Sequence, residues 1–248
     1  MTRDLRVGIV SGCLGAPMGS VGKSDLFHQV AAGQIAAAGI RLRVSLRGID
    51  DFRVERMLEH LDFLVHDRKC SILAFQIRPT LLRHAAVVFW KDRRRPGRPR
   101  VRLSPYYEHD LNEWAPPNGL APTSRLPRTN DSVAWCTGLL GRARTQVVAQ
   151  LRTVAHHARR ELRRPLIFIG PVFNATLSPP SDRYWTRVIR EECARLETPF
   201  VDLCDFSLAR TPDRFEADGF HVSRCGHRLV GERFAAILQD DSQRSDGV

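Results

Sequence analysis

The feature that most constrains the fold of this chain is the repeated alternation of short apolar strand patterns with longer helix patterns. The expected strands cover residues 7–10, 42–46, 71–77, 166–170 and 199–203. The expected helices cover about 24–38, 55–65, 140–163, 182–196 and 226–238. Alternation of this kind favours a parallel sheet with helices on both of its faces. We therefore predict an α/β fold, a three-layer sandwich around a central, mainly parallel five-stranded sheet.

Length and composition fit a single domain. With 248 residues and 43% apolar content, the chain can bury one sizeable core, and we place this domain at residues 1–238. Residues 88–136 break the alternation and are longer than an ordinary connection of about 2–6 residues, so we interpret them as an insert or lid. Residues 239–248 are polar and are expected to form a disordered tail.

The net charge and the cysteine content limit which partners and which cellular compartment are expected. The net charge of +11 suits an acidic partner, but the basic residues are nearly all arginine, so we do not infer nucleic-acid binding from charge alone. The six cysteines include no C-x-x-C pair, and we expect no metal and no cofactor. The sequence shows no signal-peptide pattern and no apolar run of membrane-spanning length. We therefore expect a cytoplasmic protein whose cysteines are thiols.

The residues with the most chemical potential follow the expected strands or lie near the C-terminus. Asp218 precedes His221 by three residues on a glycine-containing turn. A carboxylate beside an imidazole fixes the tautomer and orientation of the ring, so that the imidazole can act as a general base. Ligands of α/β folds bind where parallel strands end. The strand ends of this chain carry the remaining candidates, Ser11, Cys13, Gly48, Arg78 and Asn174.

The short segments that carry these residues follow one another along the chain in an order that resembles the sequence blocks of the SGNH (GDSL-type) hydrolase superfamily. The resemblance covers about residues 5–238 apart from the insert. Members place a nucleophilic Ser in Gly-Asp-Ser after the first strand and an oxyanion Gly after the second. An oxyanion Asn in Gly-x-Asn-Asp follows the third strand, and Asp-x-x-His lies near the C-terminus. Here residues 218–227 are similar to the family's Asp-Gly-x-His-x-Ser-x-x-Gly-His form, and Gly48 matches the oxyanion glycine. The resemblance implies a flavodoxin-like SGNH fold.

Two blocks depart from the family pattern. Ser11-Gly12-Cys13 occupies the place of Gly-Asp-Ser, so the nucleophile position falls on Cys13, with Ser11 as the fallback. A thiolate is intrinsically a better nucleophile than an alcohol and needs less help from a base. Arg78 takes the place of the oxyanion Asn, where its charge suits a developing oxyanion or a substrate carboxylate or phosphate. Asn174 either lines the site or caps a loop.

The resemblance implies acyl chemistry. We expect an esterase, thioesterase or acyltransferase that forms a covalent acyl-enzyme on Cys13, with His221 as base and Asp218 as its orienting group. The main-chain N–H groups of Cys13 and Gly48 would form the oxyanion hole. The basic insert suits an acidic protein partner such as an acyl carrier protein.

Two other functions stay open at this point. The departures are compatible with a degenerate hydrolase that only binds a ligand or partner. Residues 15–24, ending in Gly19–Ser24, are close to the sequence pattern of a phosphate-binding Walker loop. Pro17 stands where that pattern needs glycine, and proline has no N–H to offer a phosphate. We interpret His227, at the start of the last helix, as structural.

Overall fold

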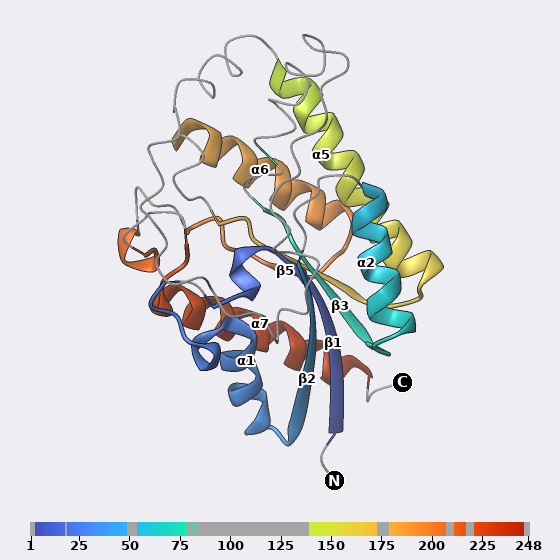
Figure 1. Ribbon diagram of the computed structural model, residues 1–248. Coiled ribbons are helices and arrows are strands. Elements are labelled where there is room, and N and C mark those ends of the chain that lie inside the picture. The colour runs from blue at the N-terminus through green and yellow to red at the C-terminus, as the bar shows by residue number, and fades with distance from the viewer. Residues whose placement is uncertain are drawn as a thin grey trace, which may run out of the picture.

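The chain folds into an α/β structure around one parallel sheet of five strands, as predicted (Figure 1). The computed structural model describes residues 3–17, 19–48, 54–78, 82, 139–172, 179–206, 211–216 and 221–245. The strands lie in the order β2-β1-β3-β4-β5. Their bounds are β1 Arg3–Ser11, β2 Ile40–Gly48, β3 Ile72–Gln76, β4 Leu166–Ile169 and β5 Phe200–Val201.

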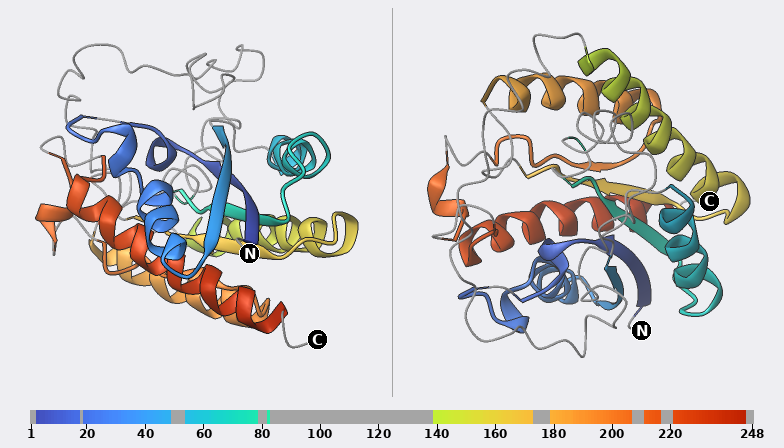
Figure 2. Two further views of the ribbon diagram at one scale, coloured as in Figure 1. Left: turned by 90° about the horizontal axis from the view of Figure 1, so that it is seen from below. Right: turned by 45° about the horizontal axis from the view of Figure 1, so that its top comes forward.

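Helices cover both faces of the sheet (Figures 1 and 2). The first buried core joins one face to α1 (Phe27–Ala36) and α7 (Arg224–Ser245). The second joins the other face to α2 (Val54–His66), α5 (Leu139–His156) and α6 (Pro179–Arg195). This gives the three-layer sandwich expected from the alternation of strand and helix patterns. None of the helices in the described ranges is long and apolar enough to cross a membrane.

The residues of β1 show how the sequence pattern generates the layers. Val7 and Ile9 pack into the core under α1 and α7, whereas Val10 packs into the core under α2 and α5. Successive strand residues point to opposite faces, so a strand covered on both sides is apolar along most of its length. Gly8 leaves room for α2, because a Cβ added there would lie 2.9 Å from the Cβ of Leu64.

Several boundaries differ from those expected. β1 and β2 are longer than predicted because they pair without interruption from Arg3 opposite Ile40 to Ser11 opposite Gly48. Main-chain hydrogen bonds extend strands past the point where the apolar pattern stops, since the ladder does not depend on side-chain type. At the C-terminus, α7 continues to Ser245, so the part of the expected tail between 239 and 245 is helical instead.

The helices also begin and end differently. The expected helix at 24–38 is a 3-10 turn, η2 (Lys23–Asp25), followed by α1. The expected helix at 140–163 is α5 followed by a π-helical segment, His157–Glu161. The expected insert at 88–136 lies outside the described residues.

The strand order locates the region where a ligand is expected. The order runs outward from β1 in both directions, since β2 lies on one side of it and β3 on the other. The chain therefore reverses its direction of winding between β1 and β3. In open parallel sheets, ligands bind at such a switch point, beyond the carboxyl ends of the strands.

Candidate active site

One side chain, that of Gln76, joins the ends of β1 and β3. Its amide oxygen Oε1 accepts hydrogen bonds from Ser11 Oγ at 2.7 Å and from the main-chain N–H of Gly12 at 2.8 Å. Gln76 and Ser11 are both buried. A buried polar group without a partner costs about 1–3 kcal/mol, so these two bonds hold the turn after β1 against β3.

Ser11 is the last residue of β1, one position later than the strand was expected to end. Its side chain has no exposed surface, and its hydroxyl donates to Gln76. A hydroxyl in this position satisfies neighbouring polar groups, and a substrate carbonyl cannot reach an atom that has no exposed surface. The geometry therefore favours a structural role for Ser11 over its role as the fallback nucleophile.

Cys13 opens the short 3-10 helix η1 (Cys13–Gly15), which follows β1 directly after Gly12. The main-chain N–H of Gly15 donates to the carbonyl oxygen of Gly12 at 3.0 Å and closes this turn. Cys13 thus stands where a strand passes into a helical turn, at the switch point of the sheet. Its side chain lies outside what the structure describes, so its role as nucleophile stays a prediction.

Arg78 lies against the same turn. It follows β3 by two residues, and a Cβ added to Gly12 would lie 2.5 Å from its Nε and 2.8 Å from its Cζ. The guanidinium is therefore packed on the main chain of Gly12, next to Cys13. This close approach requires glycine at position 12, because any larger residue would displace the arginine. The positive charge that the sequence places after β3 is thus brought to the turn that carries Cys13.

Gly48 ends β2 on the other side of β1. It is paired in register with Ser11 and is buried, so the end of β2 lies beside the turn after β1. This places the predicted oxyanion glycine one strand away from Gly12 and Cys13. Residues 49–53, which follow it, lie outside the described part of the chain.

His221 lies in a short hairpin that connects the 3-10 helix η5 (Pro212–Arg214) to α7. The hairpin consists of residues 214–216 paired with residues 221–223. The main-chain N–H of Glu216 donates to the carbonyl oxygen of His221 at 2.8 Å, and Phe215 forms an antiparallel bridge with Val222. The main-chain N–H of Ser223 donates to the carbonyl oxygen of Arg214 at 2.9 Å. These contacts fix the backbone on both sides of His221, whose side chain is buried.

A second contact of Glu216 ties this hairpin to the segment that carries Cys13. The hydroxyl of Ser20 donates to Glu216 Oε1 at 2.8 Å. A Cβ added to Gly19 would lie 3.1 Å from Oε2 of the same carboxylate, and Gly19 has a positive φ of 61°. A left-handed backbone and a close contact both favour glycine there. The segment after η1 is therefore in direct contact with the hairpin of His221.

Two predicted site residues cannot be placed. Asp218 and Asn174 both lie outside the described residues. The structure therefore brings together Ser11, Gly48, Arg78 and the backbone of Cys13, and it ties the hairpin of His221 to the same end of the sheet. The pairing of Asp218 with His221 stays a prediction.

His227 behaves as the structural residue that the sequence analysis expected. It is buried, and its Nδ1 accepts a hydrogen bond from the main-chain N–H of Phe27 at 3.3 Å. Burial, followed by repulsion from His28 when that ring is protonated, lowers the pKa of His227 to about 4, and burial lowers the pKa of His28 to about 4 as well. Both imidazoles are therefore neutral near pH 7. Within the described ranges, no group of three or more His, Cys, Asp or Glu side chains could hold a metal ion.

The geometry of residues 19–24 does not favour the nucleotide-binding alternative. A phosphate-binding loop follows a strand directly and leads into a helix, whereas here η1 separates this segment from β1. The main-chain N–H of Gly22 is already donated to Asp25 Oδ2 at 3.1 Å. The carboxylate occupies one of the donors that a phosphate would need and repels an anion.

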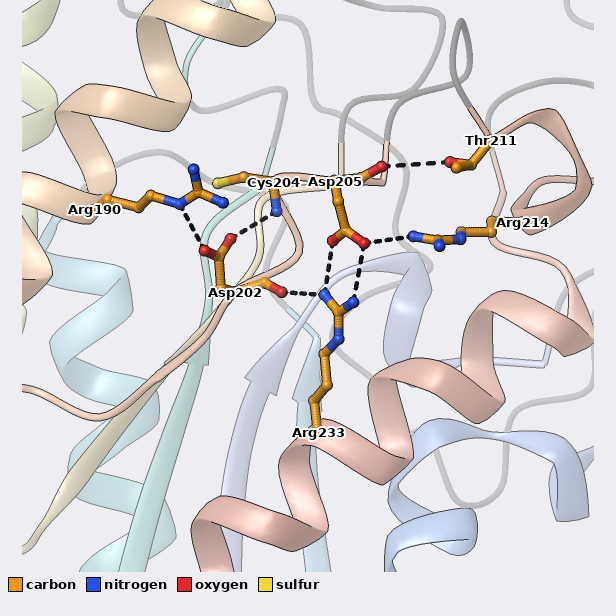
Figure 3. Close-up of polar contacts among 7 residues, drawn as sticks. All are labelled: Arg190, Asp202, Cys204, Asp205, Thr211, Arg214 and Arg233. Atoms are coloured by element: carbon orange, nitrogen blue, oxygen red, sulfur yellow. Dashed lines mark hydrogen bonds and ion pairs between the residues drawn. The ribbon is translucent and has the colours of Figure 1, made fainter.

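Sequence reasoning missed two groups of polar residues near the site. Gln76 had no predicted role, although a polar residue that ends an apolar buried strand is a signal in itself. The second group follows β5, where Asp205 binds Arg214 and Arg233 (Figure 3). No spacing rule joins these three residues, so the sequence offered no signal for this contact.

Comparisons with known proteins identify the fold. No family model and no curated protein matches the chain. Among solved structures, TesA has a TM-score of 0.56 at 17% identity, covering 95% of this chain and 98% of that chain. A catalytic mutant of Axe2, an acetylxylan esterase from Geobacillus stearothermophilus, has a TM-score of 0.55 at 16% identity and covers 94% of each chain. A lipase/acylhydrolase from Enterococcus faecalis has a TM-score of 0.53 at 14% identity and covers 97% of each chain. At such identities the likeness shows the fold, which is the SGNH-hydrolase fold.

Proposed function

We propose that the protein is an acyl hydrolase or acyltransferase of the SGNH type that acts on an ester or thioester. The observation that carries this proposal is the arrangement at the switch point. The turn that begins with Gly12 and Cys13 has Arg78 packed on it, and the segment after it contacts the hairpin of His221. The structural neighbours include an acetylxylan esterase and a lipase/acylhydrolase, which supports the same chemical class.

In the proposed first step, the Sγ of Cys13 attacks the substrate carbonyl carbon while His221 takes the thiol proton. Asp218 orients the imidazole and stabilises the imidazolium that forms. The carbonyl oxygen becomes an oxyanion, which the main-chain N–H groups of Cys13 and Gly48 and the guanidinium of Arg78 stabilise. The tetrahedral intermediate then collapses. The bond to the leaving group breaks, His221 returns the proton to that group, and the acyl chain stays on Cys13 as a thioester.

The second step decides between hydrolysis and transfer. His221 removes a proton from water, an alcohol, an amine or a thiol, which then attacks the thioester carbon. The C–S bond breaks and the thiol of Cys13 is restored by the proton that His221 carries. Asn174, which follows β4 in the sequence, is proposed to line the site.

The partner proposed for this enzyme is an acidic protein, such as an acyl carrier protein, that presents the acyl group as a thioester. The net charge of +11 supports this proposal, because a basic surface attracts an acidic partner and speeds its approach. A cytoplasmic setting is also proposed, because thiols such as that of Cys13 stay reduced there.

The proposal is tested by intact-protein mass spectrometry after incubation with a panel of acyl thioesters and activated esters. We expect a single acyl adduct on the wild-type protein that is lost in Cys13→Ala and strongly reduced in His221→Ala. The Ser11→Ala variant is the matched control, since it changes a neighbouring hydroxyl and should keep the adduct. Loss of the adduct in Ser11→Ala but not in Cys13→Ala would move the nucleophile to Ser11. Absence of any adduct and of turnover would favour the degenerate binding protein.

A further inference from the structure

The carboxylate of Asp205 holds two arginines at once, just beyond the end of β5 (Figure 3). Arg233 donates to it through both terminal nitrogens, at 2.7 and 2.9 Å, and Arg214 donates to Oδ2 at 2.7 Å. Burial by itself raises the pKa of Asp205, but the hydrogen bonds from Arg233 and Arg214 outweigh it and hold this pKa far below its usual range. Asp205 is therefore ionised whenever the protein is folded near neutral pH.

The three residues come from different segments of the chain. Asp205 follows β5, Arg214 ends η5, and Arg233 lies on α7. Both guanidinium groups also lie over the ring of Phe206, with Cζ 4.6 Å from its centroid for Arg214 and 5.6 Å for Arg233. The ring and the carboxylate together allow each arginine few orientations, because charge-assisted bonds are directional.

Arg214 connects this cluster to the backbone around His221. Its carbonyl oxygen accepts the main-chain N–H of Ser223, and the next residue, Phe215, bridges Val222. The residue that binds Asp205 through its guanidinium therefore also pairs, through its main chain, with Ser223 in the hairpin that carries His221. The hydroxyl of Thr211 also donates to the carbonyl oxygen of Asp205, at 3.4 Å.

We propose that Asp205 is a positioning residue, which sets the hairpin that carries His221 through Arg214 and α7 through Arg233. This inference rests on the proposed function, because His221 is the general base only in that reaction. Asp205 acts through the two arginines and does not touch the substrate. Misplacement of a base by about 1 Å can cost on the order of 100-fold in rate.

The test compares Asp205→Asn with Asp202→Asn. Asp202 is a matched control, because it lies on the same segment and also binds an arginine, Arg190, at 2.6 Å. That arginine belongs to α6 and not to the hairpin. Single-turnover acylation by an activated ester such as p-nitrophenyl acetate is followed at several substrate concentrations, well below the melting temperature of each variant.

For Asp205→Asn we expect a fall of about 10- to 100-fold in the maximal acylation rate, with the half-saturating concentration within about twofold of wild type. Asp202→Asn should keep the wild-type rate. The deficit should shrink as the pH rises from about 7 to about 9.5, because free thiols, whose reference pKa is about 8.5, then ionise without a base. Arg214→Lys, which keeps a charged donor, should retain more activity than Arg214→Met.

Equal loss of rate in both aspartate variants, or a deficit that does not change with pH, would overturn the positioning role. If the wild-type protein forms no acyl adduct, the proposed function fails, and the positioning is then judged by hydrogen exchange. We expect the amides of Glu216 and Ser223 to exchange at least about tenfold faster in Asp205→Asn than in Asp202→Asn. Equal exchange in the two variants would refute the inference whatever the reaction of the protein.

Discussion

At the scale of single residues, the site depends on how closely side chains approach the turn after β1. Gln76 holds this turn from one side through two hydrogen bonds to its amide oxygen. Arg78 packs on it where a Cβ at Gly12 would lie. The absence of a side chain at position 12 therefore determines where the positive charge of Arg78 lies relative to Cys13.

Gly12→Ala is predicted to push the guanidinium of Arg78 away from the turn. The new Cβ would lie 2.5 Å from Nε, which is closer than non-bonded atoms approach, and the flexible arginine would yield before the backbone. We expect the acylation rate to fall by about 10- to 100-fold, since loss of one oxyanion donor has an effect of at least this size. The rate is measured with the same activated ester as above.

The control for this prediction is Gly33→Ala on α1, where a Cβ would meet no atom of the described residues within 4 Å. That variant should keep the wild-type rate and gain a little stability, because alanine favours a helix more than glycine does. Arg78→Ala and the double variant should have acylation rates within about threefold of the rate of Gly12→Ala. All three variants remove the same contact, that of Arg78 with the turn after β1. A normal rate in Gly12→Ala together with a slow Arg78→Ala would contradict the prediction.

At the scale of elements, α1 and α7 pack so closely that two histidines are enclosed between them. His28 is on α1 and His227 is on α7, and both are nearly fully buried. No described residue forms a hydrogen bond with Nδ1 of His28. Close packing also requires glycine at position 231, because a Cβ there would lie 2.6 Å from the carbonyl oxygen of Phe27.

This pair predicts a loss of stability in mild acid. Both histidines have a folded pKa of about 4, against 6.5 for the ordinary group, so the unfolded chain binds protons that the folded protein does not. The free energy of unfolding should therefore fall as the pH drops from about 6.5 toward 4, by up to about 1.4 kcal/mol per pH unit for each histidine. Urea unfolding at a series of pH values measures this slope.

The pH range of this measurement separates the effect of the histidines on the free energy of unfolding from the effect of the acidic groups. Asp205 has a pKa below 3.8, so its contribution is lost only as the pH falls below the range of the measurement. His28→Gln should flatten the slope, whereas His66→Gln, a change at an exposed residue at the end of α2, should leave it unchanged. An unchanged slope in His28→Gln would mean that the two imidazoles do not cause the acid sensitivity.

At the scale of the whole molecule, the net charge of +11 acts on a partner at longer range than any individual contact. We predict that the protein binds an acidic acyl carrier protein with an affinity that falls as salt is raised from about 0.05 to 0.5 M, because exposed charges are screened over about 10 Å at 0.1 M. Fluorescence anisotropy of a labelled carrier measures the affinity, with a neutral protein of similar size as the control. Binding that does not respond to salt would exclude a partner selected by charge.

The sequence by itself determined the class of the fold and the places where chemistry was to be sought. All five expected strands are present, and their ends carry Cys13, Gly48 and Arg78 at the switch point of the sheet. The reason is that apolar periodicity records which face of each element is buried, and this is a local property of the chain. The insert at 88–136, Asp218 and Asn174 lie outside the described residues and stay predictions.

Only the tertiary structure decided which polar groups meet. Ser11 and Gln76 are 65 positions apart, and Asp205 and Arg233 are 28 positions apart, so no local pattern joins either pair. Their contacts depend on strand order, on the register of β1 with its neighbours and on how α7 returns to the end of β5. Packing fixes these relations only once the layers have assembled, and therefore the enclosed hydroxyl of Ser11 and the clamp on the hairpin of His221 were visible only in the folded chain.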